Sequence, residues 1–176
     1  MENYTKIIFT DEDYNFIKDL SDRIIEEKKK EEIHKKDGKC EPKRWTTGLF
    51  GELAVEKYFN INIIDETVGN SKNYAHADLK KAGYNVGVKT CCFPNFPVIN
   101  RDIHEPQLFV LLNEKKTQAM ILGLADLDLL QENLKDKSND ELIFMKSMLD
   151  KKTAFSKIEK LKKINSIDEL ETYRIK

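Results

Sequence analysis

The chain has 176 residues, of which 35% are charged and 40% are hydrophobic. This length suits one domain with its own hydrophobic core and excludes a chain of two full-sized domains. The 30 basic and 31 acidic side chains nearly balance, so any surface that binds nucleic acid must be a local basic patch.

The sequence carries no sign of a membrane segment or of export. No apolar run approaches the ~20 residues of a membrane span, and the start, "MENYTKIIFTDED", is not typical of a secretory signal. Cys40, Cys91 and Cys92 are an odd set that forms no disulfide framework and no C-X-X-C zinc pair. We therefore expect a cytoplasmic protein without membrane contact.

Two helices are predicted in the first third of the chain. Thr10 precedes an acidic first turn and an apolar stripe at helical spacing, and the pattern ends in the charged run before Gly38. That run is read first as a solvated helix surface and second as a DNA contact. The second helix is "GLFGELAVEKYF", residues 48–59, which Thr46 or Thr47 would cap; its glycines allow a neighbouring element to approach closely.

Strands and then helices are predicted in the rest of the chain. The runs rich in Val, Ile, Leu, Phe and Tyr are "INIID" (61–65), "HADLK" (76–80), "YNVGVKT" (84–90), "QLFVLLN" (107–113) and "QAMILGL" (118–124). The second and third of these runs would form a hairpin with Gly83 near its tip, and the last two a tight pair. Helices are predicted at 126–134 and 138–149. This order predicts an α/β fold with a mixed central β-sheet flanked by helices.

Three residues in these elements have the chemistry that phosphodiester hydrolysis requires. A divalent metal must polarise the phosphate, carboxylates must hold the metal, and a cation should lie near the developing charge. Mg²⁺ takes hard oxygen ligands and uses only one or two protein carboxylates. Asp78, Lys89 and Glu52 would supply these groups from neighbouring strands and a packed helix.

The two stretches "GLFGELAVEKYF" and "HADLKKAGYNVGVKT" together resemble the core of the PD-(D/E)XK nuclease superfamily, which has the restriction-endonuclease-like fold. In that family a helix with a glutamate precedes a hairpin that carries an aspartate and then a D/E-X-K strand. The resemblance covers roughly Trp45 to Leu130. It implies a single restriction-endonuclease-like domain over 1–176, with a core at about 45–130 and helical N- and C-terminal additions, the latter at 131–176.

The resemblance also implies the roles of individual residues. Asp78 would bind the metal, and Lys89 would orient or activate the attacking water. The backbone carbonyl of Val88 would be a further metal ligand, and Glu52 would join the metal shell directly or through water. The implied cofactor is Mg²⁺, for which Mn²⁺ would substitute.

The chain departs from the family pattern at two positions. Ala77 stands where the family name has proline, and Gly87 stands where the first acid of D/E-X-K belongs. We expect that the missing acid has migrated to Glu52, with Glu56 one helical turn further as the second candidate. A catalytically inactive member of the fold and a chance match remain the alternatives.

Each residue also has an ordinary structural interpretation. Glu52 would then be a solvent-facing helix residue, Asp78 a turn cap, and Lys89 a charged edge-strand residue that opposes aggregation. The candidate DNA contacts come from three segments around the motif, of which the Pro-rich one at 90–107 is alternatively a plain surface loop. They are Lys43, Arg44, Lys72, Asn73, Asn95, Arg101 and His104.

The sequence thus predicts a Mg²⁺-dependent DNA endonuclease, such as a small restriction enzyme or a phage or mobile-element nuclease. A homodimer is expected, because a two-fold pair of sites attacks both strands of a duplex. The main alternative is a non-catalytic module of the same fold that binds DNA or protein. A third interpretation is a structural or regulatory α/β protein without a nucleic-acid role.

Overall fold

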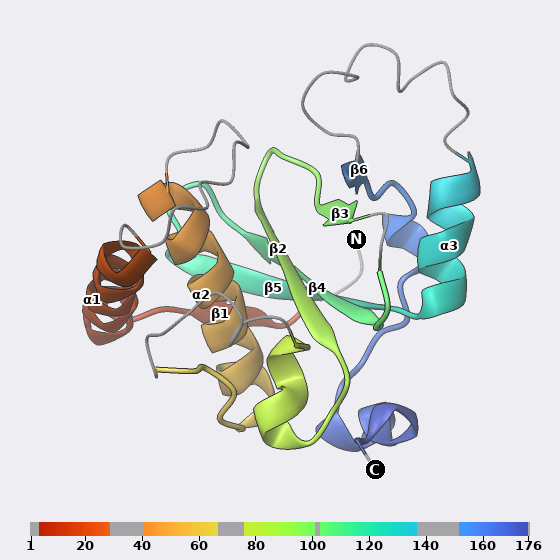
Figure 1. Ribbon diagram of the computed structural model, residues 1–176, viewed down its shortest axis with the longest axis horizontal. Helices are drawn as coiled ribbons and strands as arrows, with labels where there is room; N and C mark the ends of the chain where they lie inside the picture. The colour runs from red at the N-terminus through yellow and green to blue at the C-terminus, as the bar shows by residue number, and fades with distance from the viewer. Residues whose placement is uncertain (1–3, 29–40, 67–75, 101–102, 137–151, 176) are drawn as a thin grey trace.

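The protein is built around a four-stranded mixed sheet with the strand order β1-β5-β4-β2 (Figure 1). The computed structural model describes residues 4–28, 41–66, 76–100, 103–136 and 152–175. The strands are β1 (Lys6–Ile8), β2 (Gly87–Cys92), β4 (Gln107–Leu112) and β5 (Gln118–Ala125). Among the described strands β2 pairs only with β4, in parallel, so its other side is an edge of the sheet.

Helices cover both faces of the sheet (Figure 1). Helices α1 (Asp11–Lys28) and α2 (Glu41–Phe59) share the larger buried cluster with one face. Helix α3 (Leu127–Asp136) and the small sheet of β3 (Val98–Asn100) and β6 (Lys152–Ala154) share a second cluster with the other face. The C-terminal segment adds two 3₁₀ helices, η4 (Ile158–Lys160) and η5 (Ile167–Tyr173).

The predicted α/β fold with a mixed central sheet is confirmed. The strands predicted at 107–113 and 118–124 form the antiparallel pair β4–β5. Asn113 closes their turn, because its Oδ1 accepts the N–H groups of Thr117 at 2.8 Å and Gln118 at 3.1 Å. The short strand β1, which precedes the first helix, was not predicted.

The predicted start of the first helix is confirmed, and that of the second is wrong. The Thr10 hydroxyl accepts the Asp13 N–H at 3.2 Å, and the Asp13 carboxylate accepts the Thr10 N–H at 2.7 Å. Helix α2 begins at Glu41, so Thr46 and Thr47 lie inside it. Their hydroxyls donate to backbone carbonyls one turn earlier, which is how threonine satisfies itself within a helix.

A hairpin with strands at 76–80 and 84–90 was predicted, and its first strand is wrong. Residues Asp78–Ala82 form a 3₁₀ helix, η2, and Gly83 ends it with a left-handed φ of 90°. The chain then returns so closely that the Leu79 N–H donates to the Val86 carbonyl at 3.0 Å. The run at 61–65 forms no strand with the described residues, although Ile63 and Ile64 are buried.

Two further predictions concern segments beyond these elements. The helix predicted at 138–149 lies outside the described residues. Within the described ranges, no helix has both the length and the apolar character needed to span a bilayer.

Candidate active site

Glycine 51 brings α2 into direct contact with β2. A Cβ on Gly51 would lie 1.7 Å from the Thr90 Oγ1, so only a glycine fits between this helix and the strand. One turn earlier, the Thr47 Oγ1 lies 3.9 Å from the Cys92 Sγ. Because side chains alternate along a strand, the even-numbered residues of β2 face α2. The same contact fixes the position of Glu52, the next residue of the helix.

Asp78 lies at the free edge of β2. It is the first residue of η2, and its Oδ2 accepts the backbone N–H of Val88. The Gly87 N–H points the other way and donates to the Pro106 carbonyl at 2.9 Å, on the side of β4. In an extended strand the N–H and C=O of one residue face the same side, so the Val88 carbonyl also faces the edge where Asp78 lies.

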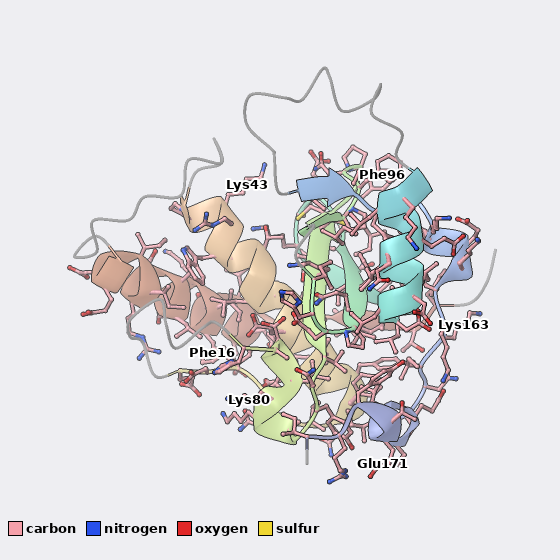
Figure 2. All side chains as sticks on the ribbon, turned by 45° about the vertical axis from the view of Figure 1, so that its right-hand side comes forward. Phe16, Lys43, Lys80, Phe96, Lys163 and Glu171 are labelled. Atoms are coloured by element: carbon pink, nitrogen blue, oxygen red, sulfur yellow. The ribbon has the colours of Figure 1, made fainter. Side chains whose placement is uncertain are left out.

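Glu52 and Asp78 line one cavity of about 430 Å³ between α2 and η2. Its wall combines apolar side chains with several ionisable ones. The lining residues are Ile24, Trp45, Leu49, Glu52, Ile63, Asp65, His76, Ala77, Asp78, Lys80 and Lys81. Lys80 is exposed and projects from η2 (Figure 2), while the Lys81 Nζ donates to the Ile64 carbonyl at 3.0 Å. Three acids, Glu52, Asp65 and Asp78, therefore share a cavity that Lys80 and Lys81 also line.

Burial and neighbouring charges shift the pKa values of Glu52 and Asp78. Burial raises the pKa of Glu52 well above its ordinary value, and the negative charge of Asp78 raises it further. Burial also raises the pKa of Asp78, whereas the Val88 hydrogen bond and the positive charge of Lys89 act in the opposite direction. A divalent cation bound between the two acids would favour their ionised forms and so oppose these shifts.

Lys89 and Gly87 lie on the face of β2 that points away from α2, because their positions alternate with Val88 and Thr90. The space beside Gly87 is filled, but not by Glu52. A Cβ on Gly87 would lie 2.6 Å from the Nε2 and 2.7 Å from the Oε1 of Gln107, a buried residue of β4. That Nε2 donates to the Glu105 Oε1 at 3.0 Å. Glu105 and Gln107 were not singled out from the sequence.

Glu56, the second candidate for the migrated acid, binds backbone amides of the segment after α2. Its Oε1 accepts the N–H groups of Ile63 at 2.6 Å and Ile64 at 2.8 Å. These bonds fold the segment after α2 back against the helix. A carboxylate oxygen that is already bonded to two amides is less available to a cation than Glu52 is.

The candidate DNA contacts are spread over the molecule. Lys43 is exposed near the start of α2 (Figure 2), and the Arg44 Cζ lies 5.6 Å from the ring centroid of Trp45. Asn95 is exposed in the turn after β2, and its Nδ2 donates to the Cys92 carbonyl at 3.1 Å.

His104 lines a different cavity, of about 470 Å³, together with residues of α3 and η5. The remaining candidate contacts, Lys72, Asn73 and Arg101, lie outside the described residues.

The described residues contain no group of three or more His, Cys, Asp or Glu side chains arranged to hold a metal ion. A pair of carboxylates with a backbone carbonyl is nevertheless what Mg²⁺ takes from a protein when water and phosphate supply its other ligands. Glu52, Asp78 and the Val88 carbonyl offer oxygen atoms of this kind. Comparisons of the chain with protein-family models, with curated proteins and with solved structures found no match.

Proposed function

We propose that the protein is a Mg²⁺-dependent endonuclease that hydrolyses phosphodiester bonds in DNA, on a restriction-endonuclease-like core. The observation that carries the proposal is the setting of Asp78. The Val88 N–H donates to its carboxylate at the edge of β2, and Asp78 and Glu52 line one cavity. The positive charge of Lys89 lowers the pKa of Asp78, against the larger effect of burial. Carboxylates that share one cavity are the kind of ligand that holds the cation in metal-assisted phosphoryl chemistry.

Each residue has a role in this proposal. Asp78, Glu52 and the Val88 carbonyl would hold the cation, which when bound polarises the phosphate and makes a water molecule more acidic. The Val88 N–H fixes one oxygen of Asp78 and leaves its other oxygen for the cation. The Lys89 ammonium would stabilise the negative charge that develops on the phosphate. Lys43 and Arg44, near the start of α2, would contact the DNA backbone.

The test is cleavage of supercoiled plasmid and of genomic DNA by the purified protein, with Mg²⁺ and with EDTA. Wild type should nick or linearise the DNA only with Mg²⁺, and Asp78→Asn should not. Asp19→Asn is the matched control, because Asp19 is an exposed aspartate of α1 that does not line the cavity of Glu52 and Asp78. Cleavage by Asp78→Asn at the wild-type rate would contradict the proposal.

A second candidate function is a non-catalytic module that binds DNA. The observation that favours it is the filled space beside Gly87, because this strand carries no acid of its own next to the lysine. Retention of DNA at low salt without cleavage, at any Mg²⁺ or Mn²⁺ concentration, would support this function over the first.

An endonuclease that cuts both strands would act as a homodimer, since each site attacks one strand. Sedimentation of the protein with and without DNA tests this part of the proposal.

A further inference from the structure

The loop that joins β2 to β3 exposes two aromatic rings. Phe93 is 62% exposed and Phe96 is 68% exposed, whereas Phe50, Phe109 and Phe155 are almost fully buried. Burying an aromatic side chain is one of the largest favourable contributions to folding, and here it is not used at two positions three residues apart. The loop therefore presents an apolar surface that is available to a partner.

The backbone of this loop is held at both of its ends. The Phe93 N–H donates to the carbonyl of Leu112 in β4 at 2.8 Å. At the other end, Pro97 is buried and its carbonyl accepts the Phe155 N–H at 2.9 Å. Phe93 and Phe96 are thus carried by an ordered segment, so a ligand that binds them loses little conformational freedom of the loop.

The first turns of α2 lie at the same end of the molecule. The Thr47 Oγ1 lies 3.9 Å from the Sγ of Cys92, the residue before the loop. The Thr47 hydroxyl also donates to the carbonyl of Lys43, one turn earlier, and the Lys43 side chain is exposed. Figure 2 shows Lys43 and Phe96 at one end of the molecule. A positive charge therefore lies on the α2 side of the exposed rings.

The turn between β4 and β5, residues 113–117, adds a second exposed lysine at this end. It begins directly after Leu112, whose carbonyl binds the Phe93 N–H, and it includes the exposed Lys115. The next residue, Lys116, joins the turn to α2, because its Nζ donates to the Thr46 Oγ1 at 2.6 Å. The loop, the turn and the start of α2 therefore form one continuous surface.

This surface is locally basic in a chain whose net charge is −1. The stretch from Thr90 to Asn100 contains no acidic residue, and Glu114 is the one acid of the turn. Two exposed aromatic rings with lysines beside them suit a ligand that has both negative charges and flat apolar faces. Unpaired nucleotides have both, whereas a duplex hides the faces of its bases in the stack.

We propose that Phe93 and Phe96 stack on bases of a single-stranded DNA segment, while Lys43 and Lys115 contact its phosphates. The inference rests on the proposed function for the choice of DNA as the ligand, and it narrows the substrate to DNA with an unpaired stretch. The loop follows β2 directly, and five residues separate Val88 from Phe93. At about 3.3 Å per residue, the unpaired bases would lie about 16 Å from the proposed metal site.

The test measures DNA binding in EDTA by fluorescence anisotropy, with labelled oligothymidine and with a duplex of the same length. Wild type should bind the single strand more tightly. Phe93→Ala and Phe96→Ala should each weaken this binding by about 5- to 150-fold, as expected for the loss of one stacked base. Their unfolding temperatures should stay at the wild-type value, because both side chains are exposed.

Ile175→Ala is the matched control for the loss of an exposed apolar side chain. Ile175 is 43% exposed, and its N–H donates to the Gly83 carbonyl, beyond the opposite end of β2 from the loop. Its affinity for oligothymidine should equal that of wild type. Lys115→Ala should lower the slope of log affinity against log salt by about 0.7, the value for one phosphate of a single strand.

Two further variants separate stacking from a general apolar contact. Phe96→Tyr keeps an aromatic ring and should bind oligothymidine almost as wild type does. Phe96→Leu keeps an apolar side chain without a π face and should lose most of what Phe96→Ala loses. If Phe96→Leu binds as tightly as wild type, stacking is overturned, and an apolar surface for a protein partner becomes the better interpretation.

The outcomes also separate this inference from the proposed function, because binding in EDTA does not require cleavage. If wild type cleaves DNA with Mg²⁺ while both Phe→Ala variants bind oligothymidine as wild type does, the inference alone is overturned. Equal affinity of wild type for the duplex and the single strand overturns it as well. If the single strand binds through Phe93 and Phe96 but no DNA is cleaved with Mg²⁺, the inference is supported and the nuclease proposal fails.

Discussion

Replacing Gly51 with alanine tests how closely α2 approaches β2, and the comparison with Gly48→Ala removes the effect of alanine on helix propensity. The new Cβ would lie 1.7 Å from the Thr90 Oγ1 and 2.8 Å from the Thr90 Cβ. Rotation of the threonine about χ1 does not move its Cβ, so the helix and the strand must separate. Gly48, three residues earlier in the same helix, has no atom within 4 Å of its Cβ position and provides the matched control.

The expected changes in the free energy of unfolding have opposite signs. Gly→Ala in a helix interior stabilises a protein by about 1 kcal/mol, which is the expected effect of Gly48→Ala. Gly51→Ala has the same intrinsic gain but adds an overpacking cost of about 1–3 kcal/mol, and the measured cost can be larger. The two variants should therefore differ by at least about 1–3 kcal/mol, with about 2–4 °C in Tm for each kcal/mol.

Urea unfolding followed by circular dichroism in EDTA measures both variants on one scale. Mg²⁺ binding gives a second readout, because separating α2 from β2 also moves Glu52 away from Asp78, so Gly51→Ala should bind Mg²⁺ more weakly than Gly48→Ala. Adding Thr90→Ala to Gly51→Ala removes the Oγ1 and should recover part of the stability. If Gly51→Ala is as stable as Gly48→Ala, the close approach of the helix to the strand is wrong.

Three further predictions concern the acids, the lysine and the basic surface. Lys89→Ala should abolish cleavage while DNA binding and unfolding temperature stay near wild type, since its cost falls on the transition state; cleavage at the wild-type rate would refute its role. In EDTA, the free energy of unfolding should fall as the pH rises above about 4.5, because the folded state keeps the Glu52 proton up to a higher pH than the unfolded state does. The slope from that proton is at most about 1.4 kcal/mol per pH unit. Glu52→Gln should flatten this fall and raise stability at neutral pH, and an unchanged profile would contradict the buried acid pair. DNA affinity should weaken steeply with salt, and Lys43→Ala should reduce the salt slope by about one unit at most, whereas Lys135→Ala on α3 should leave it unchanged.

The parts of the fold that were predicted correctly are those set by local patterns. Thr10 with its acidic first turn, the apolar stripe of α1 and the turn at Asn113 are each determined within a few residues. The segment at 76–80 has no such pattern. Its five residues suit a strand or a tight helix equally well, and its outcome depends on the contact of Leu79 with the returning Val86.

The start of α2 was missed for a related reason. Thr46 and Thr47 are good helix caps by residue type, and they were expected to mark the first turn. In the structure the helix continues back to Glu41, and both hydroxyls bond to carbonyls inside it. A threonine hydroxyl finds a hydrogen-bond partner both at a helix cap and inside a helix, so its position does not determine where the helix begins.

The pairing of β2 with β4 could not be read from the sequence, and it decides which acids meet. Nothing near Gly87 in the chain indicates that Gln107 will be its register partner. The sequence predicted that Glu52 would replace the acid missing at 87. The structure shows that the amide of Gln107, from β4, occupies the space beside Gly87.

The sequence ranked Glu52 first and Glu56 second as the migrated acid, and the two residues lie one turn apart on the same helix. The difference arises from what each carboxylate already binds. Glu56 accepts hydrogen bonds from two backbone amides of the segment after α2. Its replacement should therefore lower the stability of the fold more than the affinity for a cation. Glu52 lies in the cavity with its pKa raised by burial and by Asp78, so its charge is a cost to the folded state that a cation would relieve. A site that binds a divalent ion must keep such a cost in the metal-free protein. Under the proposed function, we therefore expect Glu52 and Asp78, rather than Glu56, to hold the cation.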